Sequence, residues 1–128
     1  MKLDTDKTIK PGQIFVFGSN EKGLHGAGAA REALEKYGAI YGKGFGHWGN
    51  SFAIPTVGNA GSRPGIGSKL SLGEIEKYVE HFLAYAAWCN GLEFFITRIG
   101  CGLAGYKDAD IGPLFAGAPP NCELPHGW

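Results

Sequence analysis

The sequence lacks an excess of charge of either sign, because its 128 residues include twelve basic and twelve acidic side chains. A balanced charge argues against a broad electrostatic surface for nucleic acid or for an anionic membrane. No apolar run approaches the roughly 18 residues that span a bilayer, and the charged N-terminus has no apolar core of a signal peptide. We therefore expect a cytoplasmic protein without general nucleic-acid or membrane binding.

Cysteine is scarce, and its spacing excludes two further classes of protein. Cys89, Cys101 and Cys122 are an odd number without a CxxC motif, so they predict neither a zinc site nor a disulfide framework. We expect no metal and no bound cofactor. A chain of this length can bury roughly two thirds of its extended surface, which is enough for one domain over residues 1–128.

Glycine, by contrast, is abundant: it accounts for 22 of the 128 residues, whereas its usual share is about 7%. The glycines follow apolar runs rather than a fixed period, which indicates functional loops between strands and helices. Ser71 and Glu74 are spaced as a capping box at the start of the clearest helix, which Gly91 should end. Pro55 should stop the second strand, because it has no N–H for a central ladder. We predict strands at Gln13–Gly18, Ser51–Thr56 and Leu92–Ile99, helices at Ala27–Gly38, Ser71–Gly91 and Asp108–Phe115, an edge strand at Asn121–Pro125, and irregular loops at Tyr41–Asn50 and Val57–Lys69.

Alternating strands and helices predict an α/β domain with a largely parallel sheet and helices on both faces. In such sheets ligands bind in the loops that follow the carboxyl ends of the strands. The segments "GSNEKGLHGAG" (18–28) and "GCGLAG" (100–105) both leave strands at that edge. The free N–H groups of a helix start and a concave row of N–H groups in a glycine loop both suit an anion. The alternative for each segment is an ordinary tight turn, and neither has the P-loop or the Rossmann spacing.

Four side chains in these loops have two interpretations each. Cys101 is a nucleophile only with a nearby base, and otherwise a small packed residue. Arg98 either meets a phosphate or pairs with Asp108 or Asp110. Asn20 either binds a ribose hydroxyl or caps its own loop. Tyr106 either stacks on a base or ribose or belongs to the core.

The two segments also resemble a known family. "GSNEKGLHGAGAAREALEKYG" is similar to the first phosphate loop and following helix of macrodomains, and "ITRIGCGLAGY" is similar to their second phosphate loop. The closest likeness is to the branch of terminal ADP-ribose glycohydrolases and antitoxins of DNA ADP-ribosylating toxins, and to short bacterial and phage macrodomain-like proteins. The resemblance covers about residues 13–115. It implies a three-layer α/β/α sandwich that binds ADP-ribose or a related phosphorylated nucleoside. By this analogy residues 26–28 and 100–106 would hold the diphosphate and the distal ribose. Together with the side chains considered above, the expected ligand-binding residues are Gly18, Ser19, Asn20, His25, Gly26, Ala27, Gly28, Arg98, Gly100, Cys101, Gly102, Leu103, Ala104, Gly105 and Tyr106.

The chain departs from the hydrolytic branch at the two catalytic positions. Where that branch has a lysine after the second strand and an aspartate after "GCGL", this sequence has Val57 and Ala104. The aspartate that recognises adenine near the first strand of many macrodomains has no counterpart either. Lys43 or Lys69 could instead approach the site from a loop.

Three functions are compatible with this pattern. The first is binding of an ADP-ribose-like nucleotide without the lysine and aspartate mechanism. The second is an ADP-ribosyl hydrolase with non-standard residues such as His25 or Asp108. The third is a bacterial or phage accessory protein that acts through protein contacts, with glycine loops that have lost their ligand.

Overall fold

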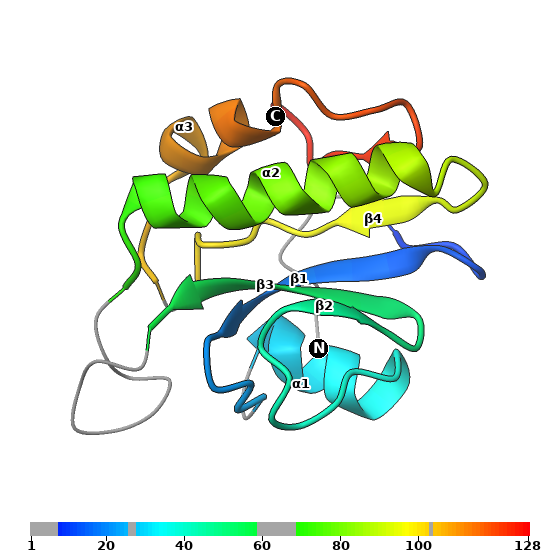
Figure 1. The fold of residues 1–128 in the computed structure, drawn as a ribbon, viewed down its shortest axis with the longest axis horizontal. Helices are drawn as coiled ribbons and strands as arrows, with labels where there is room; N and C mark the ends of the chain where they lie inside the picture. Colours follow the sequence, from blue (N-terminus) through cyan, green and yellow to red (C-terminus); the bar gives the residue numbers. More distant parts are fainter. Residues whose placement is uncertain (1–7, 26–27, 59–68, 103) are drawn as a thin grey trace.

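The chain folds into short strands and helices around one sheet (Figure 1). The computed structural model describes residues 8–25, 28–58, 69–102 and 104–128. Within them, the elements in chain order are β1 (Ile14–Asn20), α1 (Gly28–Lys36), β2 (Gly46–Trp48), β3 (Ser51–Val57), α2 (Leu72–Trp88), β4 (Phe94–Ile96), α3 (Asp108–Ile111), the 3-10 turn η1 (Gly112–Phe115) and β5 (Cys122–Glu123).

The sheet has five strands in the described residues, in the order β2-β3-β1-β4-β5. Strand β1 pairs in parallel with β3 and β4, and β4 pairs in parallel with β5, whereas β2 is antiparallel to β3. Because β1, β3 and β4 run in the same direction, their carboxyl ends lie at one edge, on the left in Figure 1. The predicted α/β class with a largely parallel sheet is therefore confirmed.

Strand β1 divides its apolar side chains between two core clusters. Ile14 and Val16 pack in a cluster with residues of α2 such as Phe82, whereas Phe15 and Phe17 pack in a second cluster that includes residues of α1. Successive side chains of a strand point to opposite faces, so a continuous apolar run fills both clusters. This burial on both sides is what the run "IFVF" predicts for a central strand.

Local signals set the ends of the two longer helices. The Ser71 side chain accepts a hydrogen bond from the Glu74 N–H, and the Glu74 carboxylate accepts one from the Ser71 N–H, so the predicted capping box of α2 is confirmed. At the end of α1, Gly38 has a φ of 79°, and the Ala39 N–H donates to the Ala33 carbonyl oxygen. The left-handed backbone of Gly38 is typical of a glycine that ends a helix. No helix in the described residues is long and apolar enough to cross a membrane.

The prediction that residues 41–50 are irregular was wrong for three of them. Gly46–Trp48 forms β2, in which His47 lies opposite Phe52 and Trp48 opposite Ser51. Gly49, with a φ of 59°, makes the tight turn between β2 and β3. Glycine content alone misled the prediction, because the exposed edge of β3 supplies the hydrogen-bonding partner that orders this segment.

Pro55 lies inside β3 rather than at its end, since the strand continues to Val57. The pairing of β2 with β3 covers Ser51 to Ala53 and stops before Pro55. A proline is tolerated where no neighbouring strand needs its N–H. The register with β1 shifts just after this position, between Ser19 and Asn20.

Several other predicted boundaries also change. The first strand runs from Ile14 to Asn20 rather than from Gln13 to Gly18, so Ser19 and Asn20 belong to β1. The third strand is shorter than predicted, because only Phe94–Ile96 of Leu92–Ile99 is β4. The predicted last helix is α3 followed by η1, and the edge strand is β5. Of the predicted loop at Val57–Lys69, residues 59–68 lie outside the described residues. Its two ends meet, because Val57 and Lys69 form an antiparallel bridge.

Candidate functional site

The two glycine-rich segments contact each other at the carboxyl edge of the sheet. A Cβ atom placed on Gly18 in β1 would lie 3.4 Å from the Gly100 nitrogen, 3.6 Å from the Ile99 Cα and 3.5 Å from the Thr56 Oγ1 of β3. The ends of β1 and β3 and the first residues after β4 therefore approach one another within van der Waals distance. The prediction that both glycine-rich segments leave strands at the same edge of the sheet is confirmed.

Hydrogen bonds within the second loop use several of its N–H groups. The Cys101 N–H donates to the Arg98 carbonyl oxygen at 3.3 Å, the Gly105 N–H to Gly102 at 3.0 Å, and the Tyr106 N–H to Gly100 at 2.8 Å. Gly100 and Gly105 have the predicted left-handed backbone, with φ of 76° and 80°. The loop is therefore a closed turn, and the row of N–H groups offered to an anion is shorter than the glycine pattern predicts.

Gly100 is packed tightly, whereas Gly102 faces open space. A Cβ on Gly100 would lie 3.0 Å from the Ile111 Cδ1. Gly102 is exposed, and a Cβ there would have no neighbour within 4 Å. Gly28, the first residue of α1, is equally open to a Cβ. The open surface of the site thus includes both loops, and the predicted contacts Gly26, Ala27 and Leu103 lie outside the described residues.

Asn20 closes its own loop, as one of its two interpretations expects. Its side-chain Nδ2 donates to the Leu24 carbonyl oxygen and its Oδ1 accepts from the Leu24 N–H, both at 2.9 Å. The preceding Ser19 hydroxyl donates to the Gly44 carbonyl oxygen. Both side chains are buried; Asn20 holds the backbone of the first loop, and Ser19 joins the end of β1 to Gly44.

His25 belongs to the first loop and is buried, with 1% of its surface exposed. Its Nε2 lies 3.1 Å from the Ile40 carbonyl oxygen, which can only accept, so Nε2 carries the proton. The Nδ1 atom is buried without a hydrogen-bond partner. Burial lowers the pKa of the imidazole, against the opposing effect of the backbone carbonyls of Ile40 and Lys43. A neutral, enclosed ring is poorly placed to activate water on a bound ligand.

Arg98 is paired with Asp108, the alternative to phosphate binding that the sequence left open. The Arg98 Nη1 lies 2.8 Å from the Asp108 Oδ1, and its Nη2 donates to the His126 carbonyl oxygen at 3.1 Å. The same Oδ1 accepts from the Trp128 indole N–H at 2.8 Å. Hydrogen bonds from Trp128 and then Arg98 lower the pKa of Asp108, so this carboxylate is a weak proton acceptor.

Cys101 belongs to the same cluster. Its Sγ lies 3.8 Å from the Asp108 Oδ1, where the thiol donates a weak hydrogen bond. The residue also packs against the core cluster on the α2 side. This geometry supports packing over the nucleophile interpretation, because the thiol faces a carboxylate that is already shared between Arg98 and Trp128.

The two positions that differ from the hydrolytic branch are enclosed. Val57 is 5% exposed and Ala104 is 8% exposed. Of the two lysines considered as replacements, Lys43 has its Nζ 5.5 Å from the centre of the Trp48 ring, beside β2. Lys69 is next to the site, because it bridges Val57 at the end of β3.

Thr56, Lys69 and Leu70 form a third wall of the site, of which the sequence reasoning named only Lys69. The Leu70 N–H donates to the Thr56 carbonyl oxygen at 2.9 Å, and the Tyr106 hydroxyl donates to the Leu70 carbonyl oxygen. Tyr106 also packs against the α2-side core, so it links the second glycine loop to the end of β3. The only sequence signal for this wall was the position of Lys69 at the end of a glycine-rich loop.

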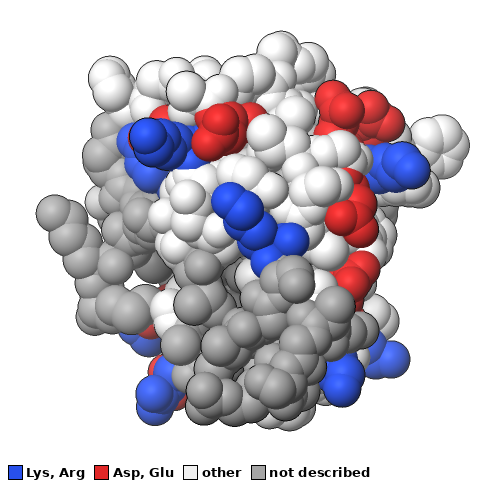
Figure 2. Space-filling model, turned by 90° about the vertical axis from the view of Figure 1, so that its left-hand side faces the viewer, with Lys and Arg blue, Asp and Glu red and all other residues white. Residues whose placement is uncertain are grey.

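Charges at this edge are mixed. Figure 2 shows the molecule from this side, and blue and red side chains are interspersed on the part not covered by grey atoms. No group of three or more His, Cys, Asp or Glu side chains in the described residues could hold a metal ion. Recognition at this edge would therefore depend on individual contacts rather than on a broad field.

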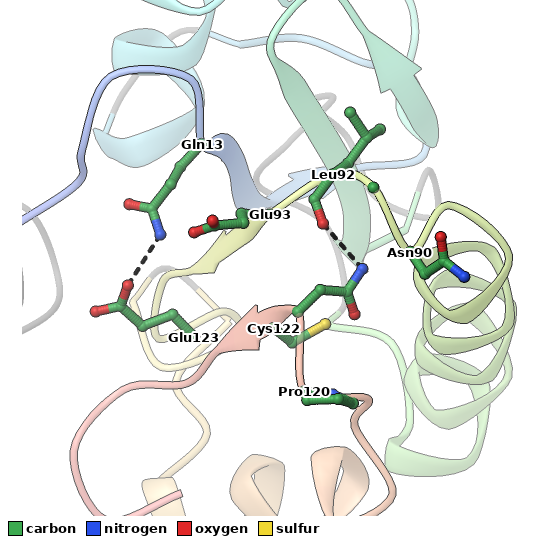
Figure 3. A pocket seen from close by; sticks show the side chains of 9 residues that line it. Gln13, Asn90, Leu92, Glu93, Pro120, Cys122 and Glu123 are labelled. Atoms are coloured by element: carbon green, nitrogen blue, oxygen red, sulfur yellow. Dashed lines mark hydrogen bonds between the residues drawn. The ribbon is translucent and has the colours of Figure 1, made fainter.

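A hollow of about 640 Å³ lies at the other end of the strands. Figure 3 shows it between the start of β4 and the C-terminal segment, with Gln13 donating to the Glu123 carboxylate at 2.9 Å. Burial raises the pKa of the Cys122 thiol, which also lines the hollow, to about 11. The sequence pattern did not predict this hollow, and none of the predicted site residues line it.

Comparison with known proteins adds no assignment: no protein-family model, no curated protein and no solved structure matches this chain.

Proposed function

We propose that this protein binds ADP-ribose or a related phosphorylated nucleoside in a cleft between its two glycine-rich loops. In this proposal the domain is a three-layer α/β/α sandwich of the macrodomain type. The observation that supports it most strongly is the close approach of Gly18 to Ile99 and Gly100 at the carboxyl edge of a parallel sheet, where a Cβ on Gly18 would lie 3.4 Å from the Gly100 nitrogen. Ligands of α/β sheets bind at this edge, where loops from separate strands meet.

The phosphates would lie over Gly28 and Gly102, which with Gly105 are the described glycines of these loops where a Cβ would have no neighbour within 4 Å. The start of α1 offers N–H groups and the positive end of the helix dipole to an anion. The proposed role of Asn20 is to hold the first loop, since its side chain is bonded to Leu24 within it, and that of Ser19 is to join the start of this loop to Gly44.

Binding without hydrolysis is the proposal that the side chains support. Val57 and Ala104 have no functional group for acid-base or nucleophilic chemistry, and both are enclosed. The non-standard candidates are poorly suited as well, because His25 is buried and Asp108 is shared between Arg98 and Trp128.

Calorimetric titration tests this function. We expect ADP-ribose to bind. The affinities of ADP, AMP and ribose 5-phosphate then show how much the phosphates and the base contribute to binding. Absence of binding at about 1 mM ligand, which corresponds to roughly 4 kcal/mol, would refute the proposal if the protein is folded. The same sample would then show no nucleotide-dependent rise in melting temperature, as the accessory-protein alternative predicts.

Two matched variants locate the site. Gly102→Val places a branched side chain in the open part of the second loop, without a left-handed backbone to strain, and should weaken ADP-ribose binding at least about tenfold. Gly91→Val makes the same change in equally open space before β4, at the other end of the sheet, and should leave binding unchanged. Equal affinities in both variants would place the ligand elsewhere.

Chromatography of released ADP-ribose distinguishes binding from hydrolysis. We expect no release after incubation with ADP-ribosylated protein or ADP-ribosylated DNA. Turnover by the wild-type protein would contradict binding alone. If that turnover survived replacement of both His25 and Asp108 by alanine, these two residues would be excluded as its catalytic groups.

A further inference from the structure

Lys69 is held at the candidate cleft by the backbone around it. It forms an antiparallel bridge with Val57, and the next residue, Leu70, donates to Thr56 and accepts from the Tyr106 hydroxyl. These contacts join Lys69 to the end of β3 and to the second glycine loop at the same time. The main chain of Lys69 is therefore fixed relative to the end of β3 and to the second glycine loop.

The ammonium group of Lys69 rests on an aromatic ring rather than on a carboxylate. Its Nζ lies 4.3 Å from the centre of the Tyr106 ring, and the residue is exposed. An exposed cation-π contact is weak, and an ammonium group has three hydrogen-bond donors that a ring satisfies poorly. A phosphate close to Tyr106 can therefore attract this group away from the ring.

The guanidinium group of the second loop is engaged differently. Arg98 bonds to the Asp108 carboxylate and to the His126 carbonyl oxygen, and its side chain is only 19% exposed. Moving it onto a ligand would leave the Asp108 carboxylate without its closest cation. A cationic side chain that contacts a diphosphate at this edge would then be one other than Arg98.

We infer that Lys69 is the cationic residue that neutralises the ligand phosphate in this cleft, turning from the Tyr106 ring to the phosphate oxygens when the ligand binds. This inference rests on the proposed function. It assigns phosphate recognition to Lys69, after β3, in addition to the two glycine-rich loops. Tyr106 then positions the lysine in the free protein.

Titrations of three lysine variants with ADP-ribose and with ADP test the inference. Lys69→Gln should weaken binding of both ligands about tenfold, because one charge-assisted contact is lost. Lys69→Arg should stay within about threefold of the wild type, since it keeps the charge and its stacking on the ring. Lys10→Gln removes the same charge from the exposed segment before β1, at the opposite edge of the sheet, and should change nothing.

Salt dependence adds a readout that a purely structural role would not change. Between about 50 and about 300 mM sodium chloride, affinity should fall more for the wild-type protein than for Lys69→Gln. Melting temperatures of all variants should agree, which excludes unfolding as the cause.

The outcomes separate the two proposals. If the wild-type protein binds and Lys69→Gln binds equally well, or if Lys10→Gln is weakened as much, the role of Lys69 is refuted and the proposed function stands. If the folded wild-type protein binds neither ADP-ribose nor ADP, both are refuted. Tenfold weakening confined to Lys69→Gln, with recovery in Lys69→Arg, supports both.

Discussion

Replacing Gly100 by alanine should destabilise the protein strongly, although it adds only one methyl group. Gly100 has a φ of 76°, and the new Cβ would lie 3.0 Å from the Cδ1 and 3.2 Å from the Cγ1 of Ile111. Ile111 is fully buried in the α2-side core and cannot move away freely. The left-handed backbone costs an alanine roughly 1–2 kcal/mol, and overpacking a core costs typically about 1–3 kcal/mol.

The sum for Gly100→Ala is about 3 kcal/mol, a large part of the roughly 5–15 kcal/mol by which domains are stable. Urea denaturation followed by circular dichroism measures it. With a slope of about 2 kcal/mol per molar urea, the midpoint should fall by about 1.5 M. Gly102→Ala in the same loop is the control, because it has neither strain nor a close neighbour, and should change stability by less than about 1 kcal/mol.

A second substitution separates the two contributions to the loss. Ile111→Val removes the Cδ1 atom, so the double variant Gly100→Ala with Ile111→Val should be more stable than the sum of the single losses by about 1 kcal/mol. If the losses of stability in the two single variants simply add in the double variant, the described contact between residue 100 and Ile111 is wrong. An unchanged midpoint for Gly100→Ala would refute the whole description of this loop.

Two further predictions concern His25 and Asn121. Because burial holds the pKa of His25 below its ordinary value near 6.5, the unfolded chain takes up the proton first, and stability should decrease as pH falls from about 6.5 toward the lowered pKa. Urea midpoints from pH 7.5 to 5 check this, and His25→Gln should have a smaller slope over about this range. The Asn121 Nδ2 donates to the carbonyl oxygens of Ala86, Cys89 and Leu92 at 2.9, 3.2 and 3.0 Å, so Asn121→Ala should cost about 1–3 kcal/mol. A calorimetric melting temperature equal to that of the wild type would contradict this prediction.

The local elements were predictable because their signals lie within a few residues of the structure they determine. The capping box of α2 spans four residues, and Gly38 ends α1 through its own backbone conformation. The apolar run of β1 predicts burial on both faces without knowledge of its neighbours. The meeting of the two glycine loops was also predictable, because parallel strands end at the same edge.

The side chains at the site were harder to predict, because their partners come from distant parts of the chain. Asp108 receives the Trp128 indole from twenty residues away, and no motif marks that pair. Asn20 is the exception, since its partner Leu24 is only four residues on, and the capping interpretation rested on that local chemistry. His25 is spaced like a site residue, yet the packing of residues 40–43 over it buries the ring.

The sequence by itself determined the class of fold, the longer helices and the edge at which the loops gather, since these follow from periodicity, caps and strand order. Only the tertiary structure decided that Gly46–Trp48 is a strand, that Pro55 fits inside β3, and that Lys69 lies on Tyr106. Each of these depends on a contact between segments far apart along the chain. A single sequence does not show which distant residues pair with each other. Packing of the whole chain decides which of the possible pairs forms.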